Sequence, residues 1–271
     1  MKKITILIAI LLALASVACF GGEEYGCFSE DSDERIPVLM YHSIKSDELY
    51  ALLPSANPMI ISESAFREQM RYLYENNFTS LTSAQLMDFL FYFGELPENP
   101  VVLTFDDGYL DNHLFAAPIM REFGMSGMMF LITAEIPEST PQMMIYPTPL
   151  MSWNELLAIT DVFELGSHTH DMHRFEGGSA ILETASEAEI RADLRRSFEE
   201  PLTLKTGFVY PYGRYSNAAI AALQAEGVRF AFTTREAYVR RSSNPMLLPR
   251  FGVYPDTTIE EFSRIVRGLQ R

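Results

Sequence analysis

The sequence VVLTFDDG, residues 101–108, is an apolar run that ends in two adjacent carboxylates and a glycine. The run predicts a buried strand, and Gly108 allows a sharp turn into a following helix. In parallel α/β folds, functional residues gather at the carboxyl ends of the strands. Adjacent side chains point in different directions, so Asp106 and Asp107 can take different tasks there. Taken alone, however, Asp-Asp-Gly is more typical of a turn whose first Asp caps a helix.

A second segment, SHTHDMH at residues 167–173, holds three of the five histidines, namely His168, His170 and His173. One Asp with two His is a facial set of metal ligands that leaves positions open for water and substrate. The second Asp is then free to act as a base, and the combination predicts metal-assisted hydrolysis. The spacing leaves open which two of the three histidines would bind the metal, and a His-rich surface loop is the alternative.

Apolar β-type runs alternate with helical patterns along the chain, which predicts a parallel sheet. About seven such units favour an irregular barrel over an open doubly wound sheet. The expected strands are Val38–Tyr41, Val101–Phe105, Met128–Ile132, Phe163–Leu165, Phe208–Tyr210, Val228–Phe232 and Phe251–Val253. The expected helices are 63–76, 83–93, 111–123, 153–160, 187–200, 217–226 and 258–270.

Local signals mark the ends of several expected helices. Capping boxes are predicted at Ser152, Ser186 and Thr257, each with a Glu three residues later. Gly124 and Gly227 are expected to end helices. The proline-rich segment 135–151 is expected to form a rigid loop that could wall a substrate groove.

The composition fits a single globular α/β domain. The chain has 271 residues, of which 48% are hydrophobic and 21% charged. The net charge of −15 makes nucleic acid a poor partner, because nucleic-acid binding needs a basic patch. The same charge argues against a strongly anionic polymer as substrate and agrees better with a neutral glycan.

Residues 1–18 have the pattern of a secretory signal: two lysines, an apolar run of ten residues from Ile6 to Ala15, and a small-residue cleavage site. The run is too short for a bilayer span of about 20 residues. Cys19 follows at once, which resembles a bacterial lipoprotein box. Lipidation of Cys19 would anchor the protein to a membrane, whereas ordinary cleavage would leave it secreted or periplasmic. Cys27, the other cysteine, would be unpaired or would close a small loop with Cys19.

The expected domain organisation follows from these boundaries. Residues 1–18 form the signal peptide, the Gly-, Ser- and acid-rich residues 19–35 a flexible tether, and residues 36–271 the folded domain.

Two further positions belong to the candidate site. Phe208–Gly213 is a strand that runs into a Pro-Tyr-Gly turn, and the backbone N–H of Tyr212 could hydrogen-bond a developing oxyanion. His42 ends the first expected strand, after Tyr41, where a core or rim histidine is the simplest interpretation.

Together these motifs resemble those of the NodB-homology polysaccharide deacetylases, carbohydrate esterase family four. Residues 104–108 match the first motif of the family, 167–173 the second and 210–213 part of the third, and the resemblance runs from about Ile36 to the C-terminus. It implies a distorted (β/α)7 barrel. It also implies that Asp107, His168 and His173 bind a divalent metal and that Asp106 is the base.

Three departures from the common family pattern point to one branch. His168 and His173 are five residues apart rather than four, Val209 stands where the family usually has Arg, and no His follows residue 173. All three resemble the branch that N-deacetylates poly-β-1,6-N-acetylglucosamine in biofilm matrices. In that branch a His after an N-terminal Tyr supplies the acid, which matches His42.

The resemblance therefore implies a metal-dependent hydrolase of an N-acetylated glycan. The signal-like residues 1–18 predict export, and we expect a monomer. Zn²⁺ is the favoured metal, although Fe²⁺, Co²⁺ or Ni²⁺ also suits two His and one carboxylate. A deacetylase for peptidoglycan or chitooligosaccharides and a non-catalytic glycan-binding lipoprotein remain as alternatives.

Overall fold

The computed structural model describes residues 34–54, 57–200 and 202–269. The expected signal peptide and both cysteines lie outside the described residues. Glu34, the first described residue, contacts the folded domain, because its Oε2 accepts a hydrogen bond from Arg241 Nε at 2.8 Å. Arg35 then donates to the carbonyl of Gly268 at 3.0 Å.

One curled parallel sheet forms the centre of the domain, in the order β11-β10-β7-β6-β5-β1-β12, with β4 paired to β5. Every pairing in this sheet is parallel, and a bridge between Phe232 and Leu248 links β11 to the segment before β12. The distorted (β/α) barrel expected from the sequence is thereby confirmed. The strands are β1 (Val38–Tyr41), β4 (Thr79–Ser80), β5 (Pro100–Asp107), β6 (Gly127–Leu131), β7 (Phe163–Ser167), β10 (Thr203–Val209), β11 (Phe230–Phe232) and β12 (Phe251–Gly252).

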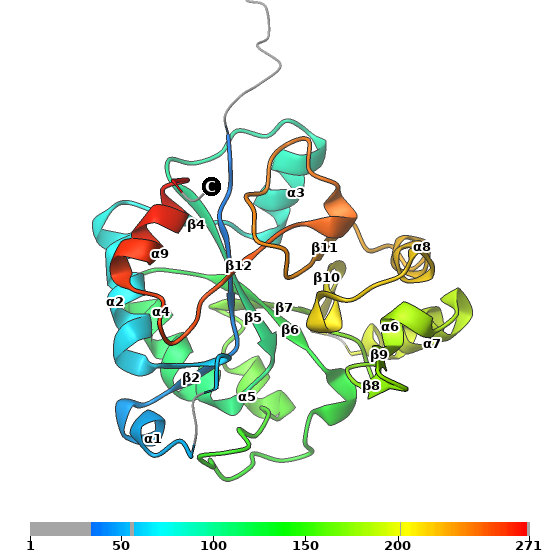
Figure 1. Cartoon of the computed structure of the whole chain (residues 1–271), viewed down its shortest axis with the longest axis horizontal. Coiled ribbons are helices and arrows are strands. Elements are labelled where there is room, and N and C mark those ends of the chain that lie inside the picture. Colours follow the sequence, from blue (N-terminus) through cyan, green and yellow to red (C-terminus); the bar gives the residue numbers. More distant parts are fainter. Residues whose placement is uncertain (1–33, 55–56, 201, 270–271) are drawn as a thin grey trace, which may run out of the picture. The chain divides into compact units, whose positions relative to one another are not determined.

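Helices follow the strands and cover the outside of the sheet (Figure 1). The expected helices are present, each of them shorter at one end or both: α2 (Glu63–Glu75), α3 (Ser83–Phe91), α4 (Ala117–Glu122), α5 (Trp153–Leu157), α7 (Glu187–Ser197), α8 (Asn217–Ala225) and α9 (Ile259–Val266). The helix expected over 111–123 begins as the π-helix η1 (Asn112–Ala116) before it becomes α4.

The capping signals were correct in two of three places. Ser152 and Ser186 form capping boxes, and Gly124 and Gly227 have positive φ after α4 and α8. The third box was misplaced by one residue, because Thr258 caps α9 by accepting the N–H of Glu261 at 3.2 Å. The Thr257 hydroxyl instead accepts the N–H of Tyr254.

Several short elements have no signal of their own in the sequence, because two to five residues cannot be stable without tertiary contacts. Two of them, β2 and β3, form a separate parallel pair, and β8 and β9 form a small antiparallel hairpin. These elements are β2 (Ser43–Lys45), α1 (Asp47–Ala51), β3 (Ile60–Ser62), η2 (Thr133–Glu135), β8 (Phe175–Glu176), β9 (Ser179–Ala180), α6 (Ile181–Thr184) and η4 (Pro245–Leu247). The short helical turn η3 (Pro211–Gly213), in contrast, is the Pro-Tyr-Gly turn expected from the sequence.

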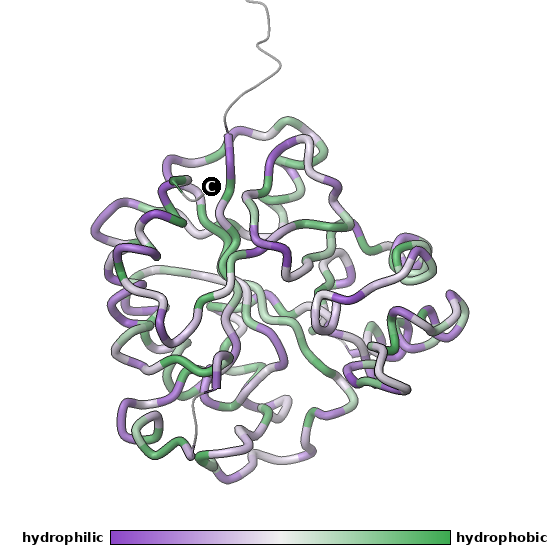
Figure 2. The backbone as a smooth tube through the Cα atoms, viewed as in Figure 1, coloured by the Kyte–Doolittle hydropathy of each residue, from purple (hydrophilic) through white to green (hydrophobic). Residues whose placement is uncertain are grey.

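The hydrophobic residues lie along the strands and the hydrophilic ones on the outer turns (Figure 2). From Val101 to Asp107 every residue of β5 is buried, as expected for a central parallel strand. Phe105 packs with ring centroids 5.1 Å from Tyr41, 5.9 Å from Phe66 and 5.0 Å from Phe163. This aromatic cluster joins β1, β5, β7 and α2.

Because the strands are parallel, the carboxyl ends of β1, β5, β7 and β10 meet at the same edge of the sheet. That edge therefore receives each segment that the sequence marked as a candidate site. In the part of the chain that the structure describes, no helix has the length and apolar character needed to cross a membrane.

Candidate active site

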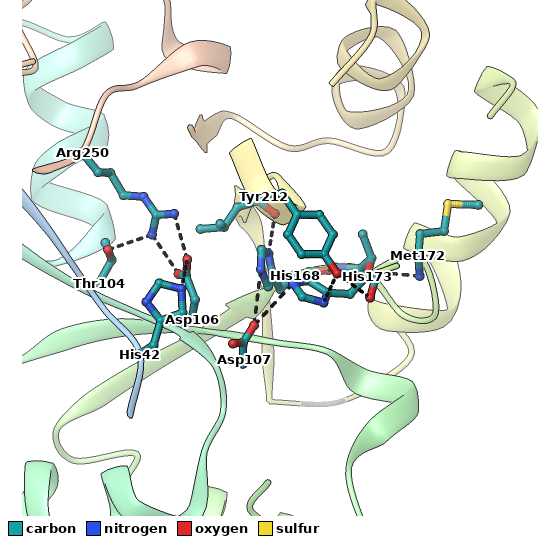
Figure 3. Close-up of polar contacts among 12 residues, drawn as sticks. His42, Thr104, Asp106, Asp107, His168, Met172, His173, Tyr212 and Arg250 are labelled. Carbon is teal, nitrogen blue, oxygen red and sulfur yellow. Dashed lines mark hydrogen bonds and ion pairs between the residues drawn. The ribbon is translucent and has the colours of Figure 1, made fainter. Parts of the chain in front are cut away.

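Three candidate ligand atoms converge at the carboxyl edge of the sheet (Figure 3). The Nε2 atoms of His168 and His173 each lie 3.6 Å from Asp107 Oδ1. Metal–ligand bonds of 2.0–2.2 Å place ligand atoms roughly 3–3.6 Å apart, so each of these two distances suits a shared ion. The three candidate ligand atoms all lie within 4.8 Å of one another, and the trio is therefore a candidate site for one metal ion. Asp107 and Gly108 form a sharp turn at the end of β5, with φ of +73° at Asp107 and +89° at Gly108. The turn directs the Asp107 carboxylate away from that of Asp106.

The chemistry of these donors suits a divalent cation. Asp107 Oδ1 is buried, and among the described residues it accepts no hydrogen bond. Burial raises the pKa of Asp107 to about 6 and lowers that of His168 to about 3, and it also lowers the pKa of His173. A divalent cation binds neutral imidazoles through their lone pairs and balances the charge of a buried carboxylate, so it would stabilise this set of side chains.

His168 is oriented by the neighbouring strand. Its Nδ1 lies 2.8 Å from the carbonyl oxygen of Val209, to which it can donate, so Nε2 faces Asp107 with its lone pair. His168 is 2% exposed. Strand β10 therefore positions a ligand that the chain supplies after β7.

His170 faces a different direction from the other two histidines of its segment. Its Nδ1 lies 2.9 Å from the Thr133 hydroxyl. The backbone N–H groups of His170 and Asp171 each donate to the carboxylate of Asp193 at 2.8 Å. With Thr169 at φ +78°, this anchoring loops the chain so that the rings of His168 and His173 lie 4.7 Å apart. The structure thus brings together His168 and His173, the pair implied by the family resemblance.

Asp106 forms a buried bidentate ion pair with Arg250, which the sequence did not indicate. The guanidinium of Arg250 donates to its two oxygens at 2.8 and 2.9 Å and also to the Thr104 hydroxyl at 3.0 Å. Burial alone would raise the pKa of Asp106, but Arg250 outweighs it and holds the pKa well below its usual range. Arg250 lies next to β12, far along the chain, and supplies a guanidinium although Val209 stands at the family's usual Arg position.

His42 and Tyr212 flank these carboxylates on either side (Figure 3). His42 Nε2 lies 3.8 Å from Asp106 Oδ2, and the His42 side chain is 16% exposed. The Tyr212 hydroxyl donates to the backbone carbonyl of His173 at 3.2 Å and lies 3.3 Å from its Nδ1. Tyr212 has φ +59°, a strained value for a non-glycine residue that its turn imposes.

A cleft of about 320 Å³ opens beside the trio. Asp107 and His173 form one side, and part of the proline-rich segment expected to wall a groove forms another. Among the described residues that line the cleft, Glu135 is an added acid and none is Lys or Arg. The other lining residues are Ser43, Asn57, Met59, Ile60, Tyr109, Ile132, Tyr146, Pro147, Thr148 and Leu150.

Comparison with known proteins agrees with this geometry. The model of the polysaccharide deacetylase family matches residues 93–231, just over half of the chain, so the chain belongs to that family and is a polysaccharide deacetylase. It is 26% identical to the poly-β-1,6-N-acetyl-D-glucosamine N-deacetylase of Staphylococcus aureus, over 94% of this chain and 93% of that protein.

Solved structures share the fold. The Streptococcus pyogenes deacetylase PplD superposes with a TM-score of 0.71 at 21% identity, covering 86% of this chain and 98% of that one. IcaB from Ammonifex degensii superposes with a TM-score of 0.70 at 23% identity, covering 88% and 97%.

The Arg250–Asp106 pair generates a first prediction. Arg250→Lys should lower turnover while retaining bound metal, because an ammonium keeps the charge but cannot make two parallel bonds to the carboxylate. Arg250→Met should lower turnover further and destabilise the fold by about 3–5 kcal/mol, because it leaves a buried carboxylate unpaired. Steady-state kinetics, metal analysis and urea unfolding measure these effects. Loss of metal from Arg250→Lys would contradict the assignment of metal binding to Asp107 and of the Arg250 ion pair to Asp106.

The orientation of the histidines generates a second prediction. His173→Ala should weaken metal affinity by more than the roughly 10–100-fold typical of losing a hydrogen-bond partner of a ligand. His170→Ala should weaken it by less than that, because its ring faces Thr133. Titration of the metal-free variants with Zn²⁺ measures both affinities. Retained affinity in His173→Ala with loss in His170→Ala would reverse the assignment.

Proposed function

We propose that this chain is a metal-dependent hydrolase that removes N-acetyl groups from N-acetylglucosamine units of an extracytoplasmic polysaccharide. The observation that carries the proposal is the Asp107–His168–His173 trio beside a second, separately held carboxylate. The trio would hold a divalent ion, for which Zn²⁺ is favoured. This division gives one Asp to metal binding and leaves Asp106 for proton transfer.

Each residue has a defined task in the proposed reaction. Arg250 keeps Asp106 ionised and oriented to take a proton from the attacking water. When bound, the divalent ion supplies Lewis-acid polarisation of the acetyl carbonyl and makes the water acidic enough for so weak a base. The Tyr212 N–H hydrogen-bonds the tetrahedral oxyanion. His42 donates a proton to the departing amine, which leaves acetate and a glucosamine unit.

The favoured substrate is poly-β-1,6-N-acetylglucosamine. The S. aureus relative that carries this substrate in its name matches almost the full length of both chains. The cleft also supports a neutral glycan, since Glu135 adds negative charge and none of the described lining residues is basic. Peptidoglycan, with its carboxylate-bearing sugars, would be repelled by such a cleft.

We also propose that the protein acts outside the cytoplasm. This rests on the signal-like residues 1–18, and on the extracellular polysaccharide that such deacetylases modify. Lipidation of Cys19 would hold the enzyme at the cell envelope, while cleavage without lipidation would release it.

Acetate release from defined glycans tests the proposed function and gives a third prediction. Zn²⁺-loaded protein should release acetate from β-1,6-linked N-acetylglucosamine oligomers faster than from chitooligosaccharides or peptidoglycan, and chelation should abolish the activity. Asp106→Asn should retain metal and lose roughly 10²–10⁴-fold in turnover. Asp107→Asn should instead lose metal. The opposite pattern in these two variants, or no acetate from any glycan, would refute the proposal.

The role of His42 gives a fourth prediction. His42→Ala should bind metal normally and lose roughly 10²–10⁴-fold in turnover on the amide substrate, because an amine must be protonated to leave. The same variant should be much less impaired on a nitrophenyl acetate, whose phenolate leaves without a proton. Parallel assays of both substrates measure the ratio. Equal losses would show that His42 is not the general acid.

A further inference from the structure

Three polar side chains that the proposed reaction does not use are buried beside the cleft. Ser43 is 2% exposed, and Lys45 and Asp111 are both 0% exposed. Ser43 and Lys45 lie on β2, directly after His42, whereas Asp111 lies four residues after Asp107 and directly before η1. We call these three residues the Ser43–Lys45–Asp111 cluster.

The cluster ties the segment after β1 to the segment after β5. The Ser43 hydroxyl donates a hydrogen bond to Asp111 Oδ2, and Lys45 Nζ lies 3.5 Å from the same oxygen. The next residue along the chain, Asn112, donates from its side-chain amide to the backbone carbonyl of His42 at 2.8 Å. Two consecutive residues, Asp111 and Asn112, thus bind the backbone or side chains of the short segment from His42 to Lys45.

The buried Lys45–Asp111 ion pair carries a desolvation cost that apolar side chains in the same place would avoid. Among the described residues, neither Lys45 Nζ nor Asp111 Oδ1 has a hydrogen-bond partner of good geometry. Burial raises the pKa of Asp111 to about 6 although the Ser43 hydroxyl and Lys45 both lower it. Apolar side chains of similar volume are often as stable as a buried ion pair or more so. Stability alone therefore gives a poor account of the cluster.

The location of the cluster gives a better account. His42 immediately precedes Ser43, and its Nε2 lies 3.8 Å from Asp106 Oδ2. Ser43 lines the same cleft as Asp107 and His173. The π-helix η1 begins at Asn112, and π-helical turns are frequent at functional sites.

We propose that the Ser43–Lys45–Asp111 cluster positions His42 against Asp106. Its members are positioning residues, because none of them touches the reacting atoms. Asp111 fixes the segment that follows His42, and Asn112 fixes the His42 backbone, so that the imidazole reaches the departing amine. The inference rests on the proposed role of His42 as the acid.

An apolar replacement of the ion pair separates positioning from stability. In the double variant Lys45→Met/Asp111→Leu, we expect an unfolding midpoint equal to or above that of the parent protein, and normal Zn²⁺ content. Turnover on the amide substrate should fall roughly 10–100-fold, since small misplacements of a reacting group cost about this much. Turnover on nitrophenyl acetate should fall less than about threefold, because the phenolate needs no acid. Loss of stability with an unchanged amide-to-ester ratio would show a purely structural role and overturn the proposal.

Matched variants complete the test. Asp111→Asn keeps the shape and the acceptor for Ser43, so it should recover much of the amide turnover. Ser43→Ala is the milder variant to use if the double variant does not fold. It should lower the ratio of amide turnover to ester turnover. Arg121→Gln breaks the exposed pair between Arg121 of α4 and Asp161 in the turn before β7, and it should change neither rate.

Coupling to His42 is the most specific readout. In a His42→Ala background, the double variant should cause no further loss of amide turnover, because the group it positions is gone. Independent, additive losses would overturn the proposal.

A crystal structure of the double variant tests the placement of His42 without reference to its chemistry. The distance between His42 Nε2 and Asp106 Oδ2 should exceed the 3.8 Å of the parent protein. An unchanged distance would overturn the proposal. If His42→Ala lowered amide and ester turnover equally, the acid assignment under the proposed function would fail, and the structural measurement would still decide on the cluster.

Discussion

A single buried guanidinium joins the two ends of the curled sheet to the edge that carries the candidate active site. Arg250 is fully buried, and it donates to the carbonyl of Thr233 at 3.0 Å as well as to Thr104 and Asp106. Thr233 follows β11, Arg250 precedes β12, and Asp106 lies near the end of β5, so one side chain links β11 and β12, the two ends of the sheet order, with β5. A charge this deep needs its carboxylate partner, because either one alone would carry a large desolvation penalty. Closure of the barrel and ionisation of Asp106 thus depend on the same interaction.

The sequence predicted what depends on neighbours along the chain. The buried character of β5, the capping boxes at Ser152 and Ser186, and the short loop that carries His168 and His173 are local patterns with local physical causes. The parallel topology then follows from the alternation of strands and helices, and it brings the marked segments to one edge. The spacing of the histidines in the sequence left open which two would bind a metal. The resemblance to the family motifs favoured His173 over His170.

The features that the sequence could not predict depend on contacts between distant residues. Arg250 meets Asp106 across 144 positions, and Asp111 meets Ser43 across 68. Asp193, which holds the His170 backbone, lies 23 residues beyond it on α7, where an Asp is an ordinary surface residue. A single Arg before an apolar strand, as in Pro249-Arg250-Phe251, was the only signal of a buried cation, and it does not say which carboxylate the cation meets. Short elements such as β2 and β3 were missed for the same reason, because they form only against the rest of the domain.

Two buried ion pairs, Arg250–Asp106 and Lys45–Asp111, lie near His42. They differ in distance and in hydrogen bonding, and this difference agrees with their proposed tasks. The pair at Asp106 has two short hydrogen bonds, and its guanidinium is also bonded to Thr104 and Thr233, so it can stabilise charge where charge is needed. The pair at Asp111 is longer, at 3.5 Å, and among the described residues its Lys45 Nζ has no hydrogen-bond partner, although the Ser43 hydroxyl donates to the carboxylate. We propose that this pair serves to fix a backbone segment. The 3.8 Å separation of His42 and Asp106 is thereby set by two anchors on different elements. We propose that these separate anchors leave His42, as the proposed acid, and Asp106, as the proposed base, each free to face a substrate.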